Sequence, residues 1–235
     1  MKKTILALAA LAVGASAYAQ EAAKTSDLAL TLDVTYVSDY VFRGVKLADD
    51  SIQPSIEAAY GDFYAGLWHS NDINSSAGAS ETDLYAGYGL ALNETFSADF
   101  GVTRYTYQGS GLSSNASTEV YAGVSADVFL SPSVYYYHDF DLEVNTYIAS
   151  IGHSFPIADL GISLDTSATY GWVQSPKADG GDYSYWGLGV AVPYALSETA
   201  TLTGAVNYTH VDRANRAADV TQDRVVASVG ISVGF

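Results

Sequence analysis

Apolar and polar residues alternate along most of this chain, and the alternation restricts the possible folds more than any other feature. In LALTLDVTY, which begins at Leu28, Leu, Val and Tyr alternate with Ala, Thr and Asp33. A period of two places successive side chains on opposite faces of a β-strand. No segment after residue 19 has a helical period, so the chain is predicted to be all-β. The pattern recurs in about twelve segments, at residues 28–40, 52–60, 63–71, 81–92, 95–107, 117–126, 133–139, 144–154, 160–172, 183–194, 200–210 and 223–235.

The connections between these segments alternate in length. One set is short, at residues 61–62, 93–94, 129–132, 155–159 and 195–199. The other set is mostly longer and rich in turn residues, at 41–51, 71–80, 108–117, 139–145, 173–182 and 211–222. Short periplasmic turns and longer extracellular loops are typical of outer-membrane barrels. The prediction is a single antiparallel up-and-down transmembrane β-barrel of about twelve strands, with both chain ends at the short-turn rim.

The N-terminus has the pattern of a secretory signal peptide. Lys2 and Lys3 precede the short apolar run ILALAALAV, and AYA supplies a small-x-small cleavage site that ends at Ala19. The apolar run is too short to be a spanning helix. We therefore expect cleavage between Ala19 and Gln20, with residues 1–19 as the signal and residues 20–235 as the barrel. The expected location is the outer membrane of a Gram-negative bacterium, as an integral protein.

Composition excludes several classes of protein. The chain has 26 Asp and Glu against 10 Lys and Arg, a formal net charge of −16, so it lacks the basic footprint of a nucleic-acid-binding protein. Charged residues make up 15% and aromatic residues 13% of the chain, which argues against a disordered acidic polypeptide. The absence of Cys excludes disulfides, thiolate metal sites and a cysteine nucleophile. Neither a GxGxxG motif after a strand nor HExxH occurs, and no cofactor is expected.

A repeated Tyr-Ala-Gly motif identifies the inner face of the predicted barrel. It occurs at residues 64–66, 85–87 and 121–123, with Tyr and Gly on one face each time. Asp83 and Glu119 share that face in the second and third copies, and carboxylates are costly against hydrocarbon, so this face is the lumen. We interpret the motif as tyrosine rings that lie over bare glycine backbone in a curved wall. The alternative is a stacking surface for sugars or bases.

Aromatic residues are expected at both ends of the outer face, as in the girdles of membrane barrels. At the short-turn rim they are Tyr60, Phe63, Phe96, Tyr194 and Phe235. At the long-loop rim they are Tyr36, Tyr40, Phe42, Trp172 and Tyr208. A terminal aromatic such as Phe235, at the end of an alternating strand, is similar to the sorting signal that the barrel-assembly machinery recognises.

Three segments resemble a known family. SDYVFRGV at residues 38–45 is similar to the first strand and loop of the TorF family of porins, also known as the Gcw_chp conserved hypothetical family. GDFYAGLW at 61–68 and TDLYAGY at 82–88 fit the same family. The resemblance implies a proteobacterial outer-membrane barrel and says little about the solute. Lys46 and Leu47 stand where small polar residues are expected, so the resemblance does not determine the chemistry of the first loop.

The candidate pore-lining residues are charged side chains that the alternation places on the lumen face. They are Asp33, Asp39, Arg43, Glu57, Asp83, Asp99, Glu119, Asp165 and Arg224. Facing acidic and basic groups create the field of an aqueous constriction. Arg43 shares its face with Asp39, and a salt bridge between them that holds the first loop is expected. Residues 139, 141 and 143 are acidic and could hold a divalent cation, but a solvated acidic loop is favoured because the pattern lacks the Gly and distal Glu of a calcium loop.

These features predict a porin-like channel for passive diffusion of small hydrophilic solutes, with mild cation preference and no enzymatic activity. The alternatives are a non-conducting structural barrel with a plugged interior and a lipid-modifying barrel enzyme. The enzyme is disfavoured because the neighbours His69 and Ser70, like His153 and Ser154, must point to opposite faces. The expected partners are outer-membrane lipid and lipopolysaccharide, the barrel-assembly machinery and the solutes, with no nucleic acid.

The loop pattern generates a test of orientation. Epitope tags inserted in the long loops, for example within 173–182, are expected to bind antibody on intact cells because surface loops tolerate insertion. Tags at Asn93 or Asp159 are expected to stay hidden until the outer membrane is permeabilised. Labelling at Asn93 on intact cells would contradict the orientation.

Overall fold

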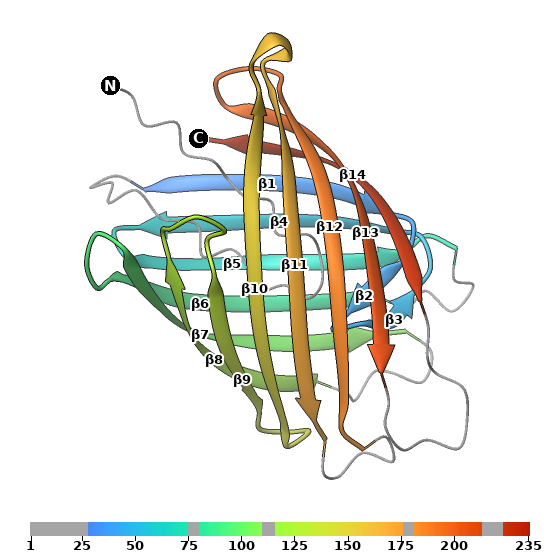
Figure 1. Ribbon diagram of the computed structural model, residues 1–235. Helices are drawn as coiled ribbons and strands as arrows, with labels where there is room; N and C mark the ends of the chain where they lie inside the picture. Colours follow the sequence, from blue (N-terminus) through green and yellow to red (C-terminus); the bar gives the residue numbers. More distant parts are fainter. Residues whose placement is uncertain (1–27, 75–79, 110–115, 176–180, 213–222) are drawn as a thin grey trace.

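The fold is a closed β-barrel. The computed structural model describes residues 28–74, 80–109, 116–175, 181–212 and 223–235 (Figure 1). Twelve antiparallel strands form the wall, and each pairs with its neighbour in the chain. These strands are β1 (Ala29–Val37), β4 (Ser51–Tyr60), β5 (Phe63–Asp72), β6 (Ser80–Ala91), β7 (Phe96–Gln108), β8 (Ala116–Ala126), β9 (Ser133–Asp139), β10 (Val144–Ile157), β11 (Ile162–Gln174), β12 (Tyr183–Ala195), β13 (Ala200–Asp212) and β14 (Arg224–Gly234).

The first and last wall strands close the barrel. β1 pairs on one side with β4 and on the other with β14, where Val34 lies opposite Ile231. The amide N–H of the terminal Phe235 also donates to the carbonyl of Leu30, at 2.9 Å. The predicted all-β barrel of twelve strands is confirmed, and the wall strands lie within a few residues of the predicted bounds.

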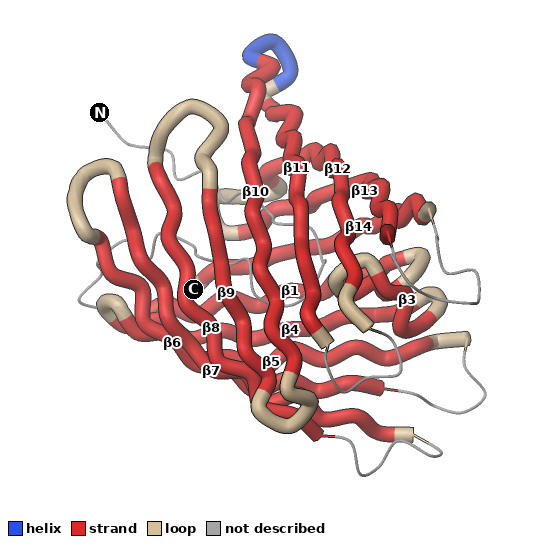
Figure 2. The backbone as a smooth tube through the Cα atoms, turned by 60° about the horizontal axis from the view of Figure 1, so that its bottom comes forward, coloured by secondary structure: helices blue, strands red, loops and turns tan. Residues whose placement is uncertain are grey.

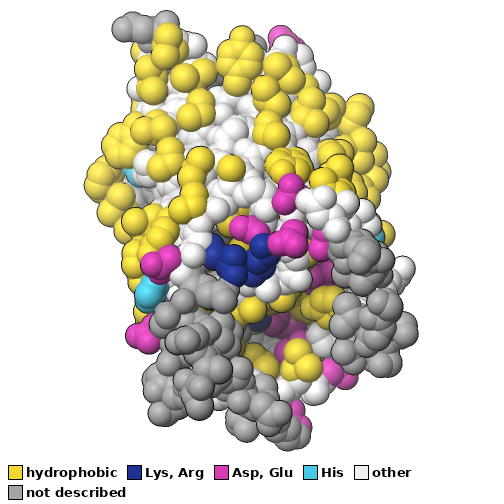
Figure 3. Space-filling model, turned by 90° about the vertical axis from the view of Figure 1, so that its right-hand side faces the viewer, with side chains coloured by type: hydrophobic (Ala, Val, Ile, Leu, Met, Phe, Trp, Pro, Cys, Tyr) yellow, Lys and Arg dark blue, Asp and Glu magenta, His cyan; other side chains and the backbone are white. Residues whose placement is uncertain are grey.

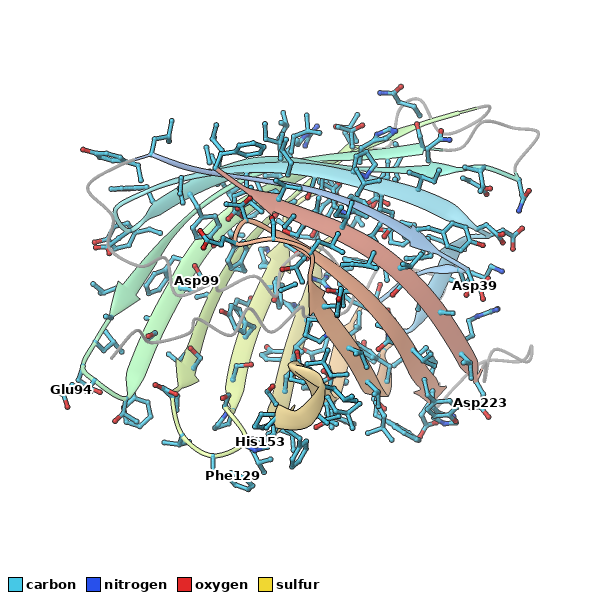
Figure 4. All side chains as sticks on the ribbon, turned by 90° about the horizontal axis from the view of Figure 1, so that it is seen from above. Asp39, Glu94, Asp99, Phe129, His153 and Asp223 are labelled. Carbon is cyan, nitrogen blue, oxygen red and sulfur yellow. The ribbon has the colours of Figure 1, made fainter. Side chains whose placement is uncertain are left out.

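The two rims differ as the connection lengths predicted. The short connections, such as residues 61–62, join strands at one end, and the long ones join them at the other. In Figure 4, Asp39 and Asp223 lie at the long-loop rim, whereas Glu94 and Phe129 lie at the opposite end. Figure 2 shows that strands make up almost all of the described wall, with the 3₁₀ turn η1 (Ala158–Leu160) as the helical element. Across the described ranges, no helix combines the length and the hydropathy needed to cross a membrane.

Side chains alternate between the inside and the outside of the wall. In β12, Leu188 is 52% exposed on the outer face, whereas its neighbour Gly189 faces inward and is buried. Strand β10 departs from this regular alternation, because the apolar Ile148 is on its inner face. Its side chain points inward and packs against a buried cluster that includes Tyr135 and Tyr137.

The first predicted strand ends earlier than expected, because the chain leaves the wall after Val37. Two short strands, β2 (Tyr40–Phe42) and β3 (Val45–Ala48), form a separate two-stranded sheet. We call residues 39–49 the inward hairpin; in Figure 1 it lies at the long-loop end of the barrel. The prediction that loop 41–51 lies on the cell surface is wrong for its first part, since Val41, Arg43 and Gly44 are buried.

Apolar contacts with the wall draw this loop inward. Tyr40 and Val41 form a buried cluster with Val37 and Val226, and Trp68 packs against that cluster. Burial of such side chains is favourable by about 1.5–3 kcal/mol each for the large aliphatic residues. Because of these contacts, Tyr40 does not belong to the outer aromatic girdle in which it was predicted to lie.

The girdle at the long-loop rim loses two of its predicted members. Tyr40 is buried, and the ring of Phe42 lies 6.0 Å from that of the inward-facing Tyr105. The other aromatic residues predicted for the two girdles are on the outer face, as predicted. They are Tyr36, Trp172 and Tyr208 at the long-loop rim, and Tyr60, Phe63, Phe96, Tyr194 and Phe235 at the short-turn rim.

The outer face of β12 generates a stability test. The sequence predicts that this face contacts hydrocarbon, where an arginine near the bilayer midplane costs about 2–4 kcal/mol. Leu188→Arg is therefore expected to weaken the folded barrel, seen as a smaller heat-modifiable shift on a gel and a lower urea midpoint. Gly189→Ser, on the inner face, is the matched control and is expected to have a mild effect. Equal folding of the two variants would contradict the assignment of faces.

Candidate functional site: the barrel lumen

The tip of the inward hairpin is a two-residue turn with unusual backbone geometry. Arg43 and Gly44 both have positive φ, at 48° and 80°. Glycine adopts this region readily, but for an L-residue such as Arg it costs about 1–2 kcal/mol. A local cost of this size persists when the surrounding contacts determine the conformation. The contacts of the Arg43 side chain provide that constraint.

Arg43 crosses from the hairpin tip to the far wall of the barrel. Its Nη1 and Nη2 donate to the two carboxylate oxygens of Glu119 in β8, each at 2.7 Å. Nη1 also donates to Thr146 Oγ1 at 3.1 Å, and Tyr105 Oη donates to Glu119 Oε1 at 2.9 Å. A planar guanidinium matches a carboxylate in this bidentate manner. The guanidinium carbon also lies 4.6 Å from the centre of the Tyr137 ring.

This ion pair is removed from water. Arg43 is 5% exposed and Glu119 is 2% exposed. Burial alone would lower the pKa of Arg43, but the charge of Glu119 and its hydrogen bonds outweigh that effect and raise the pKa. Arg43 therefore stays charged, and Glu119 supplies the opposite charge that makes its burial tolerable.

The predicted salt bridge between Arg43 and Asp39 is wrong. Lys46 forms ion pairs with Asp39 and with Asp49 at the base of the hairpin, and both carboxylates raise the pKa of Lys46, Asp39 more strongly. The tight turn explains the difference, because it places Arg43 at the tip while Asp39 remains at the base beside β3. In Figure 3, Lys and Arg side chains lie against Asp and Glu near the middle of the view, below the hydrophobic outer wall.

Gly44 fits closely against the opposite wall. A Cβ atom at this position would lie 2.6 Å from Val211 Cγ2 and 2.8 Å from Tyr185 Cβ. Real Cβ atoms do not make such contacts, so a larger residue would push the hairpin tip away from β12 and β13. The hairpin therefore spans the lumen at its long-loop end, with Arg43 against one side and Gly44 against another.

Five tyrosine rings lie on glycines directly opposite them in the neighbouring strand. The two members of each pair face each other in register, and a Cβ atom on the glycine would overlap the tyrosine ring. The pairs are Tyr64–Gly87, Tyr85–Gly66, Tyr121–Gly101, Tyr135–Gly123 and Tyr185–Gly171. The first two copies of the Tyr-Ala-Gly motif lie in the adjacent strands β5 and β6 and cover each other's glycines, whereas the third copy, in β8, pairs with Gly101 of β7 and Tyr135 of β9. The structure supports the interpretation as wall packing.

Three of these tyrosines, Tyr64, Tyr85 and Tyr135, donate hydroxyl hydrogen bonds to carboxylates in the lumen. Tyr64 Oη donates to Asp99 Oδ1 at 2.8 Å and lies 2.5 Å from Tyr121 Oη. Tyr135 Oη donates to Asp99 Oδ2 at 3.3 Å. Because Tyr64 and Tyr121 belong to strands that are not neighbours, this bond connects separated parts of the wall through the lumen.

Another tyrosine binds a second carboxylate in the lumen: Tyr85 Oη donates to Glu57 Oε2 at 3.0 Å. We call this set of hydrogen-bonded groups the tyrosine–carboxylate layer. It consists of Tyr64, Tyr85, Tyr121, Tyr135, Glu57 and Asp99. The layer lies closer to the short-turn rim than the hairpin tip does, because its residues lie away from the long-loop ends of their strands.

The remaining predicted acids also face inward. Asp33 accepts from Ser55 Oγ at 3.3 Å, and Asp165 accepts from Ser163 Oγ at 2.8 Å. Asp83 is 0% exposed, and neither of its carboxylate oxygens receives a hydrogen bond from the described residues. Glu81 and Asp139, which were not among the predicted pore-lining residues, are buried on the same face. Glu81 has the same parity as Asp83 and could have been found, whereas Asp139 was assigned to the following loop.

Basic side chains are scarce in the lumen. Arg43, Lys46, Arg104 and Arg224 are the Lys and Arg residues in the described ranges. Arg104 points outward and pairs with Asp141 at 3.2 Å, and Arg224 begins β14 at the long-loop rim, facing inward. Within the described part of the chain, the lumen near the short-turn rim therefore holds carboxylates without a facing Lys or Arg.

The acidic run that starts at Asp139 does not form a metal site. Asp139 Oδ1 accepts the backbone N–H groups of Asp141 and Leu142, at 3.0 and 2.8 Å, which builds a turn. Asp141 instead binds Arg104 on the outer side. No group of three potential ligands that could hold a metal ion occurs among the described residues.

The histidines and serines predicted to point apart do so. His69 lies on the outer face and hydrogen-bonds Thr82 Oγ1 at 2.9 Å, whereas Ser70 is buried inside and bonds to Gln53. Ser154 donates to Asp165 inside the barrel, away from His153, whose ring lies 4.7 Å from Phe129. In the described ranges, no histidine ring is hydrogen-bonded to a serine.

The tyrosine–glycine pairs generate a second stability test. In Gly123→Ala the new methyl group would overlap the body of the Tyr135 ring, and such overpacking costs about 1–3 kcal/mol. Gly89→Ala is the matched control, since it is also on an inner face and has no atom within 4 Å of the new Cβ position. The measurement is urea unfolding in lipid vesicles, followed by tryptophan fluorescence. Equal midpoints for the two variants would show that the rings do not need the glycines.

Comparisons with known proteins agree with this architecture. The KdgM porin aligns over 87% of this chain and 99% of its own, with 15% identity and a TM-score of 0.58. The NanC porin aligns over 87% and 98%, with 11% identity and a TM-score of 0.56. The COG4313 outer membrane channel from Pseudomonas putida F1 aligns over 88% and 95%, with 12% identity and a TM-score of 0.57. At these identities the likeness concerns the fold. No curated protein matches the sequence.

A family model covers nearly the whole chain. It matches residues 21–233 and is described as "Bacterial protein of unknown function (Gcw_chp)". The Gcw_chp part of the sequence resemblance is thereby confirmed, while the description itself specifies no activity. The chain belongs to the Gcw_chp family of bacterial proteins.

Proposed function

We propose that this protein is an outer-membrane channel for the passive diffusion of small hydrophilic solutes. The observation that carries the proposal is a closed barrel with an apolar outer face and a polar, charged inner face. In a bilayer every backbone polar group must be paired within the protein, and a closed barrel satisfies this condition. An outer apolar band with a polar interior suits lipid outside and water or solute inside.

The proposed location and partners follow from the same surface. Hydrocarbon and lipopolysaccharide would contact the outer face, where residues such as Leu188 and Val190 are exposed. Phe235 is 73% exposed at the short-turn rim, where the barrel-assembly machinery could bind it as a sorting signal. The porins and the channel of similar fold support this location.

The lumen charge supports a preference for cations over anions. Asp33, Glu57 and Asp99 are near enough to interact electrostatically, and no described Lys or Arg faces them. A low-dielectric wall strengthens the field of such carboxylates and concentrates cations in the lumen. Arg43 neutralises Glu119 and so reduces the bias, which is why a mild preference is proposed.

The charge of the lumen also indicates which solutes this channel would accept. A further match is the KdgM porin in complex with disordered oligogalacturonate, which is a polyanion. Carboxylates in the lumen of the present chain would repel such a solute. We therefore propose neutral or cationic solutes for this channel.

A non-conducting barrel is the second candidate, and the inward hairpin favours it. The hairpin spans the long-loop end of the lumen and buries Arg43 against Glu119. An enzyme is not proposed, since the described histidines lack serine partners. Conductance separates the channel from the non-conducting barrel.

Reversal potential in a potassium chloride gradient tests the proposal. The purified protein in a planar bilayer is expected to conduct with a modest excess of K⁺ over Cl⁻ permeability. Replacing two carboxylates, in Glu57→Gln/Asp99→Asn, should shift the reversal potential toward zero. Raising the salt to 1 M should do the same, because the Debye length falls to about 3 Å.

Asp141→Asn is the matched control, because it removes a carboxylate from the outer side of the wall and should leave the reversal potential unchanged. An anion-selective reversal potential would contradict the proposed charge preference. The absence of conductance in the wild type would favour the non-conducting barrel.

A further inference from the structure

The inward hairpin is attached to the barrel differently from any wall strand. β2 and β3 pair with each other in a sheet of their own and not with the wall. In the described ranges, backbone hydrogen bonds from this region to the rest of the barrel occur only at its two ends. Ser38 N–H donates to Ala227, and Asp50 accepts from Ile73 N–H. The hairpin can therefore move without breaking the wall ladder.

Internal contacts make the hairpin a single unit. The ion pairs of Lys46 with Asp39 and Asp49 join the beginning and end of the hairpin, so they would travel with it. Between those two ends, its links to the wall are side-chain contacts and the close approach of Gly44 to Tyr185 and Val211. At the base, the Tyr40 ring lies 5.4 Å from that of Trp68, and at the tip Arg43 binds Glu119 and Thr146.

The docked position carries costs that an open position would relieve. Tyr40 of the hairpin interacts with both Glu81 and Asp83 of β6. Asp83 is fully buried and has no hydrogen-bond donor among the described residues. Water admitted by an opened hairpin would hydrate these carboxylates, as well as Arg43 and Glu119.

We propose that the inward hairpin is a hinged plug of the channel, with the Arg43–Glu119 ion pair as its latch. The hinges are the two connections at residues 38–39 and 49–50. Rupture of the latch releases the tip from β8 and lets the hairpin swing toward the long-loop rim, which opens the lumen. The gating part of this inference depends on the proposed channel function, whereas the hinge motion does not.

Thiol labelling tests the motion independently of conductance. The chain has no cysteine, so Val41→Cys introduces a single thiol at a hairpin position that is 3% exposed. In this background, Arg43→Ala and Glu119→Gln should each raise the rate of modification by a charged, water-soluble thiosulfonate about tenfold or more, as expected when a local opening becomes easier by about 1.4 kcal/mol. Arg104→Ala, which breaks an ion pair outside the lumen, is the matched control and should leave the rate unchanged.

The same variants are then compared in planar bilayers with the native Val41. Loss of the latch should at least double the mean single-channel conductance or the open fraction. Only variants that retain the heat-modifiable gel shift of a folded barrel are compared. If Arg43→Ala does not fold, Glu119→Gln still provides the test, because it preserves the shape of the side chain.

The outcomes separate the two proposals. Unchanged labelling in folded Glu119→Gln would overturn the hinged plug, even if the wild type conducts. Faster labelling without conductance in any variant would support the hinge and reject the channel. Faster labelling together with increased conductance would support both.

Discussion

Closure of the backbone ladder is the constraint on which the rest of this structure depends. β1 bonds to both β4 and β14, so the wall has no free edge and its peptide groups are paired around the circumference. A sheet that closes on itself must separate two environments, and a strand period of two assigns alternate side chains to each. The apolar outer face and the polar inner face of this chain are consequences of that closure.

Inside the wall, the same geometry decides where bulky side chains fit. Tyrosines such as Tyr135 lie across a glycine in the next strand, which holds the rings against the wall. Their hydroxyls then reach carboxylates such as Asp99. Packing and polar satisfaction are thus achieved by the same side chains, since tyrosine has an apolar ring and a hydrogen-bonding end.

The inward hairpin uses the space that remains. Its apolar base packs on Val226, and its charged tip reaches Glu119 on the far wall. A buried ion pair holds position well, since separating the partners leaves two uncompensated charges, yet it is less favourable overall than its Coulomb attraction suggests. Such a contact specifies one docked geometry while leaving an alternative geometry within reach, which is the property that a latch requires.

The sequence by itself determined the twelve wall strands, their faces and the two unequal rims. These features depend on local alternation and turn composition. Leu188 and Gly189, for example, are neighbours in the sequence and therefore lie on opposite faces of their strand. The Tyr-Ala-Gly motif also indicated that tyrosine rings pack on glycine backbone, and antiparallel register brings its first copy opposite its second. Only the tertiary structure decided that Tyr40 and Phe42 turn inward and that Arg43 binds Glu119 instead of Asp39. Those partners are 76 residues apart in the chain, and a contact at that separation depends on the closed circumference of the barrel, which no local pattern encodes.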